Sequence, residues 1–167
     1  MRTDEEVHLT LAGIGHLGVA GPNDFHLPCH LLARGDLVVT DSLLSALIGE
    51  EMSSVIFIRD YVQLDFDGPK LSLFSWPQIA VDSTVRLMGD PGYRDTLCAL
   101  IGHAVLAATE DTDTGLVVDF GLGSVVVKPE PSQVEGPEIA LLMGFTDRAD
   151  WMVWRPGEYP FDGPEWS

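Results

Sequence analysis

The hexapeptide LSALIG, residues 44–49, recurs 53 residues later as LCALIG, residues 97–102. The dipeptide Asp65-Phe66 then recurs as Asp119-Phe120, and PQIA at 77–80 is followed by PEIA at 137–140. The matches keep their order, and their spacing widens where the chain inserts a loop before the last one. We therefore predict an internal duplication, with a first repeat over residues 40–89 and a second over 90–155, packed together as one domain.

Each repeat starts with a stretch that favours a short helix, over residues 42–48 and 93–101. Apolar residues recur there at helical spacing, and Gly49 and Gly102 stand where a residue in the left-handed conformation ends many helices. The sequence therefore predicts two short helices that face the core.

Runs of β-branched and aromatic residues predict strands after each helix. In the first repeat they cover 53–59, 61–66, 71–76 and 85–88, and in the second 104–109, 116–120, 124–128, 139–143 and 151–154. The connections are short, which favours antiparallel pairing. We expect an α+β fold, mainly antiparallel β, in which a helix followed by a hairpin or meander occurs twice.

Two segments flank the repeats. Residues 1–39 form an N-terminal arm with a Gly- and Pro-rich middle, and residues 156–167 are too rich in Pro and Gly for regular structure. We expect the latter to be an extended aromatic tail. Its aromatic and acidic side chains are candidates for partner binding: Glu158, Tyr159, Phe161, Asp162 and Trp166. For Trp151 and Trp154, on a predicted strand, we favour a place in the core.

The charge balance restricts the partners. The chain has 26 Asp and Glu against 9 Lys and Arg, a net charge of −17. Phosphate backbones and anionic membranes would be repelled, whereas a basic protein would be attracted. Two cysteines are too few for a disulfide framework, and the start of the chain lacks a basic region leading into an apolar run. We expect a cytoplasmic protein that binds neither nucleic acid nor membrane.

Catalytic motifs are missing from the sequence. It contains no G-x-S-x-G, no H-E-x-x-H and no phosphate-loop lysine. The segment GIGHLG at 13–18 has the spacing of a dinucleotide loop, but Gly21 and Pro22 interrupt the helix that such a loop must open. We expect no cofactor, and a binding protein rather than an enzyme.

Two weaker groups remain as candidate sites. His26, Cys29 and His30 could supply imidazole and thiolate ligands to a metal, but no second cluster of ligands occurs elsewhere, so we favour an ordinary turn. A cleft between the two repeats could hold a small molecule, and its polar candidates are Asp60, Tyr93, Arg94 and Asp95.

The stretch 44–154, about two thirds of the chain, resembles small uncharacterised actinobacterial proteins with a domain of unknown function. The resemblance rests on GDPGYRD at 89–95, LIG at 100–102 and GPE at 136–138. It implies no activity and no functional residues.

Three functional hypotheses follow. The first is an acidic module, similar to immunity proteins, that caps a basic protein with its carboxylates. The second is a small-molecule-binding protein or enzyme with a pocket between the repeats. The third is a subunit of a homo-oligomer that pairs through strand edges or the tail.

Overall fold

The computed structural model of the protein describes residues 42–145 and 150–166. They belong to one compact unit. The predicted arm, residues 1–39, lies outside the described residues. The unit is mainly antiparallel β-structure with few helices, as the sequence predicts. Its strands form two five-stranded sheets that share one apolar core.

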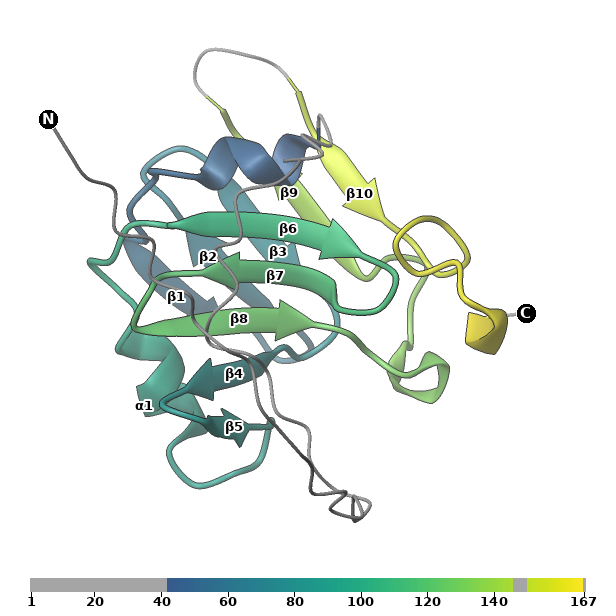
Figure 1. The fold of residues 1–167 in the computed structure, drawn as a ribbon, viewed down its shortest axis with the longest axis horizontal. Coiled ribbons are helices and arrows are strands. Elements are labelled where there is room, and N and C mark those ends of the chain that lie inside the picture. Colours follow the sequence, from purple (N-terminus) through teal and green to yellow (C-terminus); the bar gives the residue numbers. More distant parts are fainter. Residues whose placement is uncertain (1–41, 146–149, 167) are drawn as a thin grey trace, which may run out of the picture. The chain divides into compact units, whose positions relative to one another are not determined.

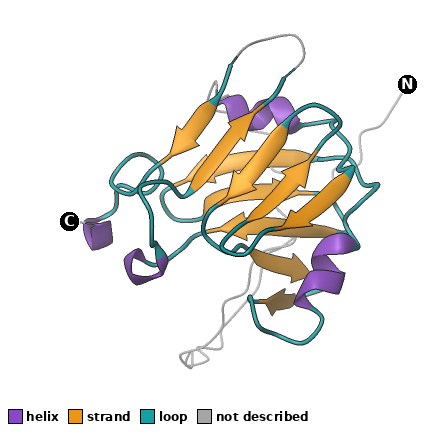
Figure 2. Cartoon of the chain, turned by 180° about the vertical axis from the view of Figure 1, so that it is seen from behind, coloured by secondary structure: helices purple, strands orange, loops and turns teal. Residues whose placement is uncertain are grey.

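The first sheet has the strand order β1-β2-β3-β9-β10, and every neighbouring pair is antiparallel. Its strands are β1 (Ser54–Phe57), β2 (Val62–Asp65), β3 (Lys70–Leu73), β9 (Ala140–Met143) and β10 (Met152–Trp154). In Figure 2, this sheet faces the reader. Its edge strands are β1 and β10.

The second sheet has the order β5-β4-β8-β7-β6 and is antiparallel throughout. Its strands are β4 (Gln78–Val81), β5 (Thr84–Arg86), β6 (Ala107–Asp111), β7 (Gly115–Asp119) and β8 (Gly123–Val127). In Figure 1 it lies in front of the first sheet, and the strands of the two sheets cross.

The strand orders of the two sheets correspond. The first sheet joins β1, β2 and β3 to β9 and β10, and the second joins β6, β7 and β8 to β4 and β5. Each half of the chain therefore builds three strands of one sheet and sends its last two strands to the sheet of the other half. The sequence predicts the individual hairpins but not this exchange between two sheets.

The two halves also meet through matching hydrogen bonds. The Gly49 N–H donates to Val105 O at 2.9 Å, and the Gly102 N–H donates to Met52 O at 2.8 Å. The helices make the corresponding contacts, because η1 (Leu43–Leu47) packs on β6 and α1 (Tyr93–Cys98) packs on β1. Gly49 and Gly102 have φ of 93° and 81°, the left-handed conformation that the sequence predicts for both.

Only one of the two predicted helices is an α-helix. The segment Leu43–Leu47 is a 3₁₀-helix, so the prediction of two short helices is confirmed only for the second segment. The Ser45 N–H and the Ser45 hydroxyl both donate to Ser42 O, and the chain is already extended at Ile48. A segment of five residues closed by such local bonds does not reach the α-helical pattern. Two further short 3₁₀-helices are η2 (Pro131–Gln133) and η3 (Pro164–Trp166).

Strand β4 is missing from the sequence prediction, and β5 begins before the predicted segment 85–88. Only one of the four β4 residues is fully buried, so the strand carries little alternation. The turn between them is Asp82-Ser83, with φ of 47° and 64°. Positive φ at both positions is the hairpin type that usually requires Asn or Gly, so the sequence signal is weak here.

The core lies between the sheets and includes both halves. Phe66 and Phe120, which directly follow β2 and β7, stack with ring centroids 6.4 Å apart and planes 5° apart. Both are buried, with the leucines and valines of β2, β3, β7 and β8 around them. The space where the two halves meet is therefore packed by aromatic and aliphatic side chains.

Candidate functional site

The four residues predicted for a pocket between the repeats lie in separate environments. Asp60 lies in the β1–β2 turn and forms an exposed ion pair with Arg59 at 3.5 Å. Tyr93 is buried, and its hydroxyl donates to Pro77 O at 2.8 Å. Burial raises the pKa of the Tyr93 phenol well above its usual range.

The other two of these residues lie on the exposed side of α1. The Arg94 guanidinium lies over the Phe57 ring, 5.1 Å from its centroid, and Asp95 is exposed in the first turn. The stacking is a cation–π contact between α1 and β1. None of the four residues lines either of the two cavities described below.

The tail is folded back on the second sheet, which corrects the prediction of an extended arm. The Tyr159 hydroxyl donates to Glu110 O at 2.9 Å, and Phe161 is only 3% exposed. The Phe161 ring meets the Trp166 ring edge to face at 6.0 Å. The remaining two predicted residues lie beside these contacts: Glu158 is 3.7 Å from Arg155, and Asp162 is 3.5 Å from Thr112. Apolar burial overrides the turn-rich composition here.

A buried carboxylate holds the end of β10 against β6. The Trp154 indole N–H donates to Glu110 Oε2 at 2.6 Å, and both residues are buried. Desolvation, together with the charges of Asp111, Glu110 and Asp162, raises the pKa of Tyr159. The contact between Trp154 and Glu110 ties the two sheets together, and the burial of Trp154 confirms its predicted core position.

One cavity lies where the tail meets the second sheet. Its volume is about 380 Å³. Polar and aromatic side chains line it, chiefly Lys128, Glu130, Glu165, Phe161 and Trp166. Lys128 Nζ donates to Asp113 O at its rim. Two of the predicted partner-binding residues, Phe161 and Trp166, therefore face this cavity.

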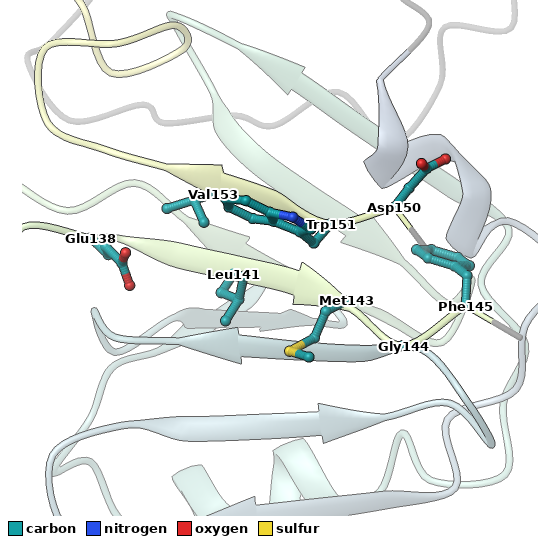
Figure 3. A pocket seen from close by; sticks show the side chains of 8 residues that line it. All are labelled: Glu138, Leu141, Met143, Gly144, Phe145, Asp150, Trp151 and Val153. Carbon is teal, nitrogen blue, oxygen red and sulfur yellow. The ribbon is translucent and has the colours of Figure 1, made fainter. Parts of the chain in front are cut away.

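A larger hollow of about 460 Å³ lies on the outer face of β9 and β10. Its floor is apolar and is formed by Leu141, Met143, Trp151 and Val153 (Figure 3). Met143 is 46% exposed and Trp151 is 64% exposed. The expected core position of Trp151 is therefore wrong.

The pleat of the sheet explains this apolar floor. Leu142 and Met152 form a cross-strand pair, and Leu142 points into the core. The next pair, Leu141 with Val153, must then point outward. Residues 141–143 and 151–154 are all apolar, so this strand pair is apolar on both faces. Sequence reasoning could have detected a second apolar face from this missing alternation.

Carboxylates lie at the two ends of the hollow. Glu138 precedes β9 and Asp150 precedes β10, and residues that precede antiparallel strands lie at opposite ends of the pair (Figure 3). Arg155 is 3.9 Å from Glu138 and also contacts Glu158, and these groups are partly exposed. The hollow is thus an apolar strip with Asp150 at one end and, at the other, Glu138 and Glu158 sharing the single cation of Arg155.

The predicted metal ligands His26, Cys29 and His30 lie outside the described residues. Within residues 42–145 and 150–166, no group of three His, Cys, Asp or Glu side chains could hold a metal ion. In the same ranges, no helix is long and apolar enough to cross a membrane. Cys98, at the end of α1, is a free, exposed cysteine.

Comparison of the chain with family models, with curated proteins and with solved structures finds no match. The resemblance to actinobacterial proteins with a domain of unknown function therefore stays a prediction.

Proposed function

We propose that the chain is an acidic protein-binding module, without enzymatic activity, that caps a basic protein in the manner of immunity proteins. The observation that carries this proposal is the hollow on β9 and β10. There Trp151, the most exposed large apolar side chain of the described residues, lies between Glu138 and Asp150. Exposed aromatic residues within an apolar strip are typical anchors of protein interfaces.

The net charge supports the same partner class. A charge of −17 raises the local concentration of cationic partners and speeds their association at low salt. The exposed apolar floor then supplies the short-range contact that charge alone does not give. Together they favour a partner surface that is basic at its rim and apolar at its centre.

Affinity capture with the full chain as bait tests this function. We expect a basic protein to be retained from host lysate at about 50 mM salt and released at about 500 mM, since screening weakens attraction between exposed charges. Trp151→Ala bait should retain much less of it, while Leu87→Ala removes an exposed apolar side chain that lies outside the hollow and should retain the same amount. Recovery of the bait alone at both salt concentrations would overturn the proposal.

The cavity beside the tail favours a second candidate, a small-molecule-binding protein or enzyme. Its volume of about 380 Å³ is in the range of ligand pockets, and Lys128 and Glu130 would supply the polar contacts. This candidate predicts that a metabolite raises the melting temperature largely independently of salt. A library of metabolites that leaves the melting temperature unchanged would speak against it.

We further propose that the domain arose by duplication of a unit that ends near residue 89. The reciprocal hydrogen bonds of Gly49 and Gly102, the stacked Phe66 and Phe120 and the exchanged strand pairs support this origin. Separately, we propose that the module is cytoplasmic, because its two cysteines are too few for a disulfide framework.

A further inference from the structure

Among the residues that the structure describes, β10 is an edge strand, and its own sequence lacks the usual protection. No described strand pairs with its far side. Proteins commonly protect such edges with Lys, Pro or a bulge, because a free row of N–H and C=O groups is a template for another strand. The segment 151–154 is Trp-Met-Val-Trp and contains neither Lys nor Pro.

The direction of the free backbone groups follows from the ladder. Trp154 O accepts a hydrogen bond from the Ile139 N–H at 2.8 Å, so the backbone groups of Trp154 point toward β9. Backbone groups alternate in direction along an antiparallel strand, and those of Val153 therefore point away from β9. The side chain of Val153 lies on the outer face with Leu141, inside the hollow.

A strand added at this edge would enlarge the apolar strip. Its backbone would bond to Val153, and its alternate side chains would lie beside Trp151 and Val153. Basic side chains at its two ends would reach Asp150 and Glu138, which lie at opposite ends of the hollow. The edge thus fits a segment that is apolar at its centre and basic at its ends.

We propose that β10 is a docking edge that pairs with an extended segment of a basic protein, whose alternate residues are apolar and whose ends carry Lys or Arg. The proposal rests on the proposed function, because it names the partner class of the same surface. It adds that recognition uses backbone pairing at Val153.

A fluorescent peptide of seven residues is the probe for this site. Lysine stands at its first and last positions, a β-branched apolar residue at the third and fifth, and threonine elsewhere, so that one face of the strand carries the match. We expect the full chain to bind this peptide, with an affinity that falls as salt rises. A peptide with glutamate in place of lysine should bind at least ten times more weakly.

Two proline variants separate the edge from the rest of the protein. Val153→Pro removes an outward N–H without removing a ladder hydrogen bond, and we expect peptide affinity to fall at least tenfold. Val85→Pro is the matched control in β5, the corresponding edge strand. The pair Val81–Thr84 closes a two-residue turn and is therefore hydrogen-bonded. The backbone groups of the next residue, Val85, consequently point away from β4, as those of Val153 point away from β9. This control should keep its affinity within about twofold, and circular dichroism checks that both variants fold.

Trp151→Ala is a second variant that keeps every backbone group and should weaken peptide binding at least tenfold. Unchanged affinity in Val153→Pro, with loss in Trp151→Ala, would overturn the docking edge and leave the proposed function in place. Capture of no basic protein by the wild-type bait would overturn both.

Two other occupants of the edge would also overturn the proposal, and each has its own readout. A dimer in light scattering that Val153→Pro dissociates would show that a second copy occupies β10. Slow hydrogen exchange of the Val153 amide in the isolated monomer would show that the chain's own residues cover it. Fast exchange in the free chain that becomes slow with the peptide supports the proposal.

Discussion

The outer face of the first sheet changes character where strands of the two halves meet. On β2 and β3 it is polar: Gln63 Nε2 donates to Asp65 Oδ1 at 2.7 Å, and Ser72 Oγ donates to Gln63 Oε1 at 3.4 Å. Next to them, β9 and β10 present the apolar floor that includes Met143 and Trp151. The polar side chains satisfy one another within the face, whereas Met143 and Trp151 are largely exposed.

The two halves of the domain differ in the same sense. They share strand pairing and the central stacked phenylalanines, but only the second half has the buried Glu110–Trp154 contact and the exposed Trp151. The stacked phenylalanines of both halves lie in the core, whereas the exposed Trp151 of the second half lies at the candidate site. The proposed binding surface therefore lies in the second half.

The strongest test of the common part is the pair of stacked rings. Phe66→Ala and Phe120→Ala should each lower the free energy of unfolding by about 3–5 kcal/mol, because both rings are buried in the shared core. Urea denaturation measures both, with Phe→Leu at each position as the milder control. A loss below about 1 kcal/mol at either ring would show that the halves do not share their core equally.

The next test addresses a contact found in the second half. Trp154→Phe should cost about 2–3 kcal/mol, because it leaves a buried Glu110 oxygen without its N–H donor. A double-mutant cycle with Glu110→Leu, which removes the acceptor, isolates the pair. If the two substitutions were simply additive, the hydrogen bond would not stabilise the junction between β6 and β10.

The helix of the second half, α1, differs from η1 because it contributes a buried tyrosine, Tyr93. Alkaline pH tests this difference. The pKa of this phenol is raised, so the folded state keeps its proton while the unfolded chain loses it above about pH 10. The free energy of unfolding is therefore unaffected by Tyr93 ionisation below that pH. Above it, the free energy of unfolding falls by up to about 1.4 kcal/mol per pH unit.

Denaturation curves between neutral pH and pH 11 measure the effect. Tyr93→Phe should lower the free energy of unfolding by about 1 kcal/mol at neutral pH, because the hydrogen bond to Pro77 O is lost. As pH rises, the free energy of unfolding of this variant should fall less steeply than that of the wild type. Equal slopes for the two proteins would assign the alkaline loss to other groups.

The smallest effects separate the two parts of the outer face. Asp65→Ala should cost about 1 kcal/mol, since Gln63 and Lys70 lose their partner. Trp151→Ala should change stability by less than about 0.5 kcal/mol, because the side chain is mostly exposed. Thermal unfolding of both variants is the measurement. A large loss for Trp151→Ala would make it a structural residue and weaken its role in binding.

Much of the local structure was predictable from the sequence. The glycines after the two short apolar segments, the hairpin strands and the antiparallel pairing all follow from patterns within a few residues of one another. The same local view placed Tyr93 and Arg94 in a shared pocket, although one is buried against Pro77 O and the other lies over Phe57. Composition near a residue does not say which distant segment covers it.

The charge of −17, the β-rich class and several of the turns follow from composition and from neighbours along the chain, so they could be predicted before the fold was known. Three features needed the folded structure: β4 and β5 join β8 while β9 and β10 join β3, and the tail folds onto Glu110. The third is that Trp154 is buried while Trp151 is exposed. Strand pairing and burial depend on contacts between residues far apart in the chain. An uninterrupted apolar run such as 151–154 can turn either of its two faces toward the core, so its own sequence does not say which side chains are buried.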